Sequence, residues 1–289
     1  LQLPNDPLLE KVNLYLLYKE WRTTSNLVET AAAIGVQARN YLENGRNAEP
    51  KYSQALDHFK SDLLAQIYLD CNKYHIVYAG LDTLVHLSQG IPRNLLGLLK
   101  QIYRRSHFAG ERPFQEGGRI SISSQGEGIR DAAAWFWDDA QPDKHGSEVR
   151  SAIESLAKLF RRVRYSLKPA ECDLATFSVN CKLGSKMARE VLNHAENWSY
   201  LIRVRDGAVS RNDSNSIDDK FQLSPMLAAR WDVSEHRRGS IELQETLFNA
   251  MFDPDCREQV ESLIGERVKG MEVPYAIENI GTGIQKKLF

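Results

Sequence analysis

The 289-residue sequence lacks an excess of charge of either sign and a long apolar run, and we expect no secretory signal peptide before its first helix. Its 37 lysines and arginines nearly balance 38 aspartates and glutamates, which gives a net charge of −1. Any surface for nucleic acid must therefore be a local patch, because the chain as a whole does not attract an anion. No apolar run approaches the roughly 18 residues that a membrane span needs. We therefore expect a cytoplasmic protein with no membrane partner.

Cysteine is scarce and scattered. The four cysteines show no C-x-x-C spacing: Cys71, Cys172, Cys181 and Cys256. This pattern argues against a zinc site or a disulfide framework and is typical of a reducing compartment. The seven histidines show no ligand spacing with cysteines or paired acids, so we predict no metal site. Cys172 and Cys181 are predicted to be buried thiols rather than nucleophiles.

The motifs of nucleotide hydrolysis are also missing. The sequence has no G-x-x-x-x-G-K-[ST] phosphate loop, and no apolar strand that ends in paired acids for Mg²⁺. Asp138 and Asp139 are adjacent on a predicted helix and point in different directions, so we interpret them as a solvated helix end packed by Trp135 and Trp137. The chain alone is therefore predicted not to hydrolyse ATP, and we assign it no catalytic residue.

The first half of the sequence predicts helix after helix. Apolar residues recur there at three- and four-residue spacing, which is the helical period. Helix starts are marked by Asp6 followed by Pro7, and by Asn26 with Glu29 at capping-box spacing. Predicted helices cover residues 5–21, 25–42, 52–70 and 81–87, then a long helix from Pro92 and another at 124–140, with a loop at 109–120. A break near 142 predicts two domains, 1–142 and 143–289.

The second half predicts a different order of elements. A strongly amphipathic helix at 147–165 is followed by a shorter helix or helix–strand mixture at 171–180 and by a helix at 183–195 with a serine cap. Residues 200–207 alternate apolar and charged side chains like a half-buried strand, and 217–225 can form its antiparallel partner. Helix, helix, turn, helix and hairpin is the order of a winged helix-turn-helix. The predicted fold class is therefore mainly α with one small β-hairpin.

A winged helix of this kind could bind DNA. The N-terminal part of its recognition helix enters the major groove, and Lys182, Lys186 and Arg189 lie near the start of that helix or on one of its faces. The hairpin and the basic turn after it add cations for phosphates: Arg203, Arg205, Arg211, Lys220, Arg237 and Arg238. A second reading stays open, because seven basic residues between 182 and 220 are nearly matched by six acidic ones. In that reading the wing binds a protein or packs against a neighbouring domain.

The stretch LSQGIPRNLLGLLKQIYRR places Gly90, Pro92 and Arg93 at the start of the long helix. The helix dipole already provides partial positive charge there, so such a start suits an anion better than a neighbouring cation. Arg93 is therefore either a surface charge or a residue that faces a negative ligand.

Gly-x-Pro-Arg at a helix start, in a helical bundle that precedes a winged helix, resembles the lid of the AAA+ ATPases of the ORC/Cdc6 type. The resemblance runs through residues 10–21, 78–103 and 220–243, and it is closest to the bacterial members. It implies that Arg93 is the sensor-2 residue, which reaches the phosphates of ATP, and that Gly90 and Pro92 shape its turn. ATP with Mg²⁺ would then be bound by a P-loop domain that we expect to precede Leu1, outside this chain.

Two classes of function follow from the sequence. The first is the nucleotide-responsive, DNA-binding lid and winged-helix part of an ORC/Cdc6-like AAA+ ATPase. Its partners would be double-stranded DNA, the AAA+ core domain, and an oligomer or an effector protein. The alternative is an interaction module that recruits a partner protein. Salt dependence separates the two, because phosphate contacts release counterions on binding.

Overall fold

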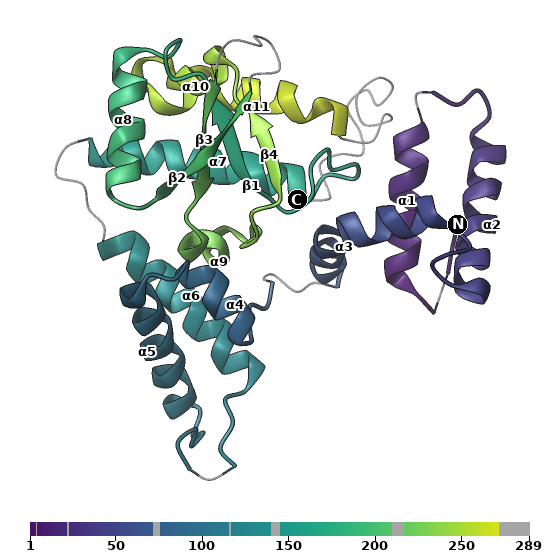
Figure 1. The fold of residues 1–289 in the computed structure, drawn as a ribbon, viewed down its shortest axis with the longest axis horizontal. Helices are drawn as coiled ribbons and strands as arrows, with labels where there is room; N and C mark the ends of the chain where they lie inside the picture. The colour runs from purple at the N-terminus through teal and green to yellow at the C-terminus, as the bar shows by residue number, and fades with distance from the viewer. Residues whose placement is uncertain are drawn as a thin grey trace, which may run out of the picture. The chain divides into compact units, whose positions relative to one another are not determined.

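The computed structural model describes residues 1–3, 5–21, 23–71, 76–115, 117–139, 145–209 and 217–271. These residues form eleven α-helices, three 3₁₀ helices and one four-stranded sheet (Figure 1). The predicted mainly α fold is confirmed at this level.

The described residues divide into two compact units. Unit 1 comprises residues 1–71, 162–172 and 266–271, and unit 2 comprises 76–161 and 173–265. The predicted functional domains, 1–142 and 143–289, follow a different division and stay a prediction. No helix of the described residues is long and apolar enough to cross a membrane.

Unit 1 is built on three helices: α1 (Pro7–Glu20), α2 (Leu27–Asn44) and α3 (Pro50–Asp70). The predicted helix starts are confirmed, because Asp6 accepts a hydrogen bond from the Leu9 amide at 3.1 Å and Asn26 caps α2 through the amides of Val28 and Glu29. The apolar residues of the three helices meet in one cluster that includes Leu9, Val12, Leu56, Phe59 and Leu63. Burying these side chains is what stabilises the helices, since helices of this length are marginal alone.

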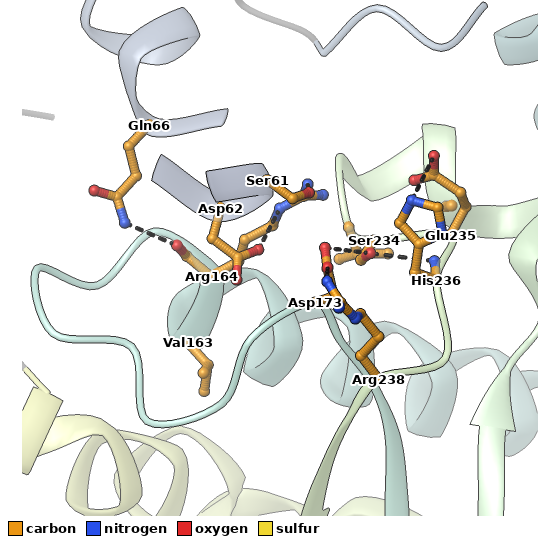
Figure 2. A network of polar contacts seen from close by, with 12 residues as sticks. Ser61, Asp62, Gln66, Val163, Arg164, Asp173, Ser234, Glu235, His236 and Arg238 are labelled. Atoms are coloured by element: carbon orange, nitrogen blue, oxygen red, sulfur yellow. Dashed lines mark hydrogen bonds and ion pairs between the residues drawn. The ribbon is translucent and has the colours of Figure 1, made fainter. Parts of the chain in front are cut away.

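A buried ion pair lies beside this cluster. The Arg164 Nε atom is 3.1 Å from Asp62 Oδ1, and the two side chains are only 4% and 1% exposed. Figure 2 shows the guanidinium of Arg164 beside the carboxylate, with the amide of Gln66 turned to the backbone. That amide donates to the carbonyl oxygens of Arg164 at 3.0 Å and Ser166 at 2.9 Å. Charged and polar groups thus tie α3 to residues that follow about a hundred positions later in the chain.

Unit 2 contains the remaining helices. They are α4 (Leu81–Ser88), α5 (Pro92–Phe108), α6 (Ile122–Asp139), α7 (Gly146–Arg164, whose last three residues belong to unit 1), α8 (Lys186–Asn197), α9 (Ala228–Trp231), α10 (Glu245–Phe252) and α11 (Val260–Val268, which ends in unit 1). The 3₁₀ helices are Pro225–Leu227, Pro254–Gln259 and Lys269–Met271. The amphipathic pattern predicted for α7 is confirmed, because Val149, Ile153, Leu156 and Phe160 are all fully buried.

The sheet of unit 2 has the strand order β2-β3-β1-β4. Its strands are β1 (Leu174–Val179), β2 (Leu201–Val209), β3 (Ile217–Leu223) and β4 (Gly239–Glu242). Strands β2 and β3 form the predicted antiparallel hairpin, β1 is antiparallel to β3, and β1 is parallel to β4. The hairpin is therefore one edge of a larger sheet.

The order predicted for a winged helix-turn-helix is wrong in one element. Residues 171–180 were expected to form a helix or a mixture, but they contain the strand β1, and the described chain between α7 and α8 has no helix. All six side chains of β1 are buried, because the strand is central and is covered on both faces. A short run that is apolar on both sides has no period that distinguishes strand from helix.

Helices α5 and α6 pack closely side by side in unit 2 (Figure 1). The contact needs Gly128, because a Cβ atom at this position would lie 2.4 Å from the Cα atom of Ile102. Beside it, the guanidinium of Arg105 donates to both carboxylate oxygens of Asp131, at 2.5 and 2.7 Å. Arg93 lies in the first turn of α5, so the packing of α5 on α6 determines its position.

Candidate functional site

The Arg93 turn has the backbone that the sequence suggested. Gln89 and Gly90 both have positive φ values, 52° and 70°, which reverse the chain after α4. Ile91 is the N-cap of α5, and Pro92 is in its first turn. The isoleucine side chain cannot accept a hydrogen bond, so no side chain caps the helix, and the first turn carries no acid. The start of α5 is therefore a positive helix end with Arg93 beside it.

Arg93 contacts two residues of α6. Its Nη2 atom donates to Asp139 Oδ2 at 3.0 Å, and its guanidinium carbon lies 5.9 Å from the centre of the Trp135 ring. The Arg93 side chain is 76% exposed. Exposed ion pairs of this kind stabilise a protein little, so Arg93 can exchange Asp139 for a stronger anion at small cost.

A shallow pocket of about 330 Å³ opens beside Arg93. It combines aromatic, amide and hydroxyl side chains with one charge of each sign. Its lining residues are Ile91, Arg93, Asn94, Trp135, Phe136, Asp139, Asn197, Trp198 and Ser199. The sequence had suggested neither the link between Arg93 and Asp139 nor the open position of Trp135, which was expected as packing. Only Trp137 of the two tryptophans is buried. A planar guanidinium at the mouth of such a pocket suits a phosphate oxygen.

Helix α8 carries the predicted recognition cations at its start. Ser185 caps the helix as predicted, accepting a hydrogen bond from the Ala188 amide at 2.9 Å. Lys186 is 87% exposed and approaches Glu190 only to 4.0 Å, and Arg189 is exposed one turn later. Lys182 is exposed in the turn before the helix. These three residues lie on one short stretch of surface and are available to a ligand.

The hairpin cations are placed less favourably. Arg203 lies between Glu196 of α8 and Asp219 of β3, with N–O distances of 2.9 and 2.5 Å, and its guanidinium covers the Phe221 ring at 4.7 Å. The pKa of Arg203 is raised above its ordinary value, mainly by the hydrogen bond to Glu196. The charges of Glu196 and Asp219 add to this effect, and burial opposes it. Arg203 therefore joins the hairpin to α8 and has no spare charge for a phosphate.

Lys220 and Arg203 lie on opposite faces of the hairpin. Arg203 is paired with Phe221 and Val204 with Lys220, and side chains alternate along a strand. The backbone of Arg205 belongs to β2, but its side chain lies outside the described part of the chain, as does all of Arg211. The predicted cations of the hairpin therefore do not meet in one group within the described residues.

The two arginines of the basic turn before β4, Arg237 and Arg238, also differ in their surroundings. Arg237 is exposed, whereas Arg238 lies 3.7 Å from Asp173, a carboxylate that is buried and also accepts from the Ser234 hydroxyl (Figure 2). Arg238 thus lies beside a buried acid just before β1, although its own side chain is 59% exposed, and Arg237 is exposed as well.

The cysteines behave partly as predicted. In unit 1, Cys172 is buried, but its Sγ atom lies 3.1 Å from His58 Nε2, a neighbour that no sequence spacing indicated. In unit 2, burial raises the pKa of Cys181 to about 12, with a further contribution from a hydrogen bond to Asp219. Among the described residues no three His, Cys, Asp or Glu side chains could hold a metal ion.

The raised pKa of Cys181 predicts slow alkylation of this thiol. At pH 8 we expect Cys181 to react with iodoacetamide about a hundredfold more slowly than the exposed Cys71, because only the thiolate is nucleophilic. Because the folded-state pKa of Cys181 lies above the value of 9.0 for an exposed thiol, this thiol's contribution to stability is complete below about pH 9 and is lost as pH rises toward 12. Site-resolved mass spectrometry measures both rates, and equal rates would contradict the assigned environment.

The protein is mainly α-helical, and it exposes Arg93 at a helix start that no side chain caps. Helix starts of this kind favour the binding of an anion. The chain matches the family model described as ORC-CDC6-like over residues 2–243, and it therefore belongs to the ORC-CDC6-like family. This membership relates it to AAA+ ATPases, which bind nucleotides. No curated protein and no solved structure matches the chain.

Proposed function

We propose that this chain is the nucleotide-responsive, DNA-binding part of an ORC/Cdc6-like AAA+ ATPase, comprising its lid and a winged-helix-like domain. The P-loop domain that would hold ATP and Mg²⁺ is not in this sequence, so the chain alone does not hydrolyse ATP. A bacterial origin and a cytoplasmic site of action belong to the same proposal.

The observation that carries the DNA-binding part is the exposed start of α8. Lys186 and Arg189 extend from the first turns of a capped helix, next to an antiparallel hairpin, and Lys182 precedes them. Helix N-termini and exposed cations both favour phosphate. The positioning of the hairpin against α8 by Arg203 supports the same assignment, because it fixes the wing relative to the helix.

The nucleotide-responsive part rests on Arg93. Its planar guanidinium can donate hydrogen bonds to a phosphate group. The dipole at the start of α5 adds to the attraction for this anion. Gly90 supplies the positive φ that the turn requires and Pro92 the fixed φ of a first helical residue. In this proposal Arg93 leaves Asp139 when the core domain presents nucleotide, and the lid angle follows the nucleotide state.

The DNA-binding assignment predicts the effect of reversing two charges on α8. We expect Lys186→Glu with Arg189→Glu to weaken binding of a labelled duplex about tenfold or more and to reduce the slope of log affinity against log salt by about 2, because two phosphate contacts are lost. Fluorescence anisotropy at several salt concentrations measures both quantities. Lys60→Glu, an exposed cation of unit 1, is the matched control.

Unchanged affinity in a folded double variant would remove the recognition-helix assignment. No duplex binding even at low salt would favour the second candidate, a module that recruits a partner protein. The observation that favours this candidate is the neutralisation of Arg203 and Arg238 by acids of the chain itself.

A further inference from the structure

The outer face of α5 is an exposed stripe of aromatic, apolar and basic side chains. Leu96, Lys100, Arg104 and Phe108 recur at four-residue spacing, and Tyr103 lies three residues after Lys100, so the five share one broad side of the helix. Leu96 is 66% exposed and Phe108 75%. The opposite side, which includes Leu98 and Ile102, is buried. The packing of α5 on α6 therefore leaves this stripe without a partner in the described structure.

The aromatic rings of the stripe are arranged for stacking. The ring of Tyr103 lies 6.1 Å from His107 in a stacked orientation and 5.2 Å from Phe114, which the following loop places at 86% exposure. The guanidinium of Arg104 covers the Phe108 ring at 5.8 Å. Because these side chains already contact one another, their rings lose little conformational freedom when another aromatic group stacks on them.

The charges around the stripe are uneven. Three acids among the described residues of this region already have partners: Asp131 and Glu127 lie beside Arg105, and Glu111 accepts hydrogen bonds from Ser121 and Ser124. The hydrogen bonds from Ser121, the largest contribution, help to lower the pKa of Glu111, so it stays ionised and occupied. Four cations of α5 and its loop have no ion-pair partner in the residues that the structure describes: Lys100, Arg104, Arg112 and Arg119. Cations therefore outnumber acids among the described residues of this surface, which gives the described part a net positive charge around its rings.

We propose that this stripe binds single-stranded nucleic acid. Unpaired bases stack on exposed rings, and a positive surface follows the phosphate backbone, which is the combination that non-specific single-strand binders use. A duplex hides the faces of its bases and could use only the cations, so the rings favour the single strand. The stripe lies on a different helix from the duplex contact proposed for α8, and it goes beyond that function. It gives the chain separate places for paired and unpaired strands.

The test is the affinity of the whole chain for a labelled oligothymidine of about 16 nucleotides. We expect Tyr103→Ala and Phe108→Ala each to weaken binding about tenfold, and Lys100→Glu with Arg104→Glu to weaken it more and flatten its salt dependence. Tyr103→Phe keeps the ring and should retain the affinity. Leu42→Ala, which truncates an exposed leucine of unit 1, controls for loss of surface apolar area. Circular dichroism checks that each variant is folded.

The same variants separate this proposal from the one for α8. Lys186→Glu with Arg189→Glu should leave oligothymidine binding unchanged, and the ring variants should leave duplex binding unchanged. Oligothymidine affinity that follows the α8 variants, or that is insensitive to both rings, would overturn the assignment. So would the absence of oligothymidine binding at low salt, a result that would make a protein the better occupant of the stripe.

Discussion

Replacing Asp62 by alanine is expected to lower the free energy of unfolding by about 3–5 kcal/mol, the typical cost of breaking a buried ion pair by removing one partner. Arg164 is 4% exposed and would remain charged with its main counter-charge gone. A further contact of the guanidinium, to the Ser61 hydroxyl at 3.2 Å, is to a neutral group. A loss of this size is a large part of the stability of an ordinary domain. Denaturant unfolding followed by circular dichroism measures it.

The matched control for Asp62 is Asp57, on the same helix. Asp57 also pairs with an arginine, Arg46, but both side chains are more than half exposed. Truncation of Asp57 should cost at most about 1 kcal/mol, since water replaces the lost partner. Replacing both buried charges, as in Asp62→Leu with Arg164→Met, should recover part of the loss. Equal costs for Asp62→Ala and Asp57→Ala would show that burial does not set the strength of the pair.

Adding one methyl group at Gly128 is expected to be the other severe change. In Gly128→Ala the new Cβ atom would lie 2.4 Å from Cα and 2.7 Å from the amide nitrogen of Ile102. Backbone atoms cannot swing aside as a flexible side chain does, so α5 and α6 must move apart. Overpacking of this kind costs about 3 kcal/mol or more. Thermal unfolding measures the loss, and hydrogen exchange of α5 and α6 localises it.

Gly126 provides the control two residues earlier on the same helix. A Cβ atom there would lie 3.5 Å from Val77 Cγ1 and 3.6 Å from the Tyr78 carbonyl oxygen, which is ordinary contact. Gly126→Ala should therefore stabilise the protein by up to about 1 kcal/mol through its better helix propensity. Destabilisation of similar size at both positions would mean that the close approach at Ile102 is not the cause.

Candidate site residues were predictable to different degrees. Gly90, Pro92 and Arg93 could be identified from the sequence because a turn, a helix start and a charge are local features. Asp139 could not be linked to Arg93, since 46 residues separate them and only the packing of α5 on α6 joins them. Similarly, Arg203 and Lys220 were grouped as phosphate contacts, but strand register places them on opposite faces.

The sequence by itself determined helices α1 to α8, the caps of α1, α2 and α8, the β2–β3 hairpin and the membership in the ORC-CDC6-like family, because periodicity, capping residues and local motifs are properties of neighbouring positions. Only the tertiary structure decided that residues 174–179 form a central strand, that Arg203 and Arg238 are neutralised, and that Asp62 meets Arg164. These outcomes depend on which distant groups share a buried environment. The cost of an unpaired charge depends on how deeply it is buried. The choice between strand and helix for a short apolar run also depends on its surroundings, because the run has no period of its own.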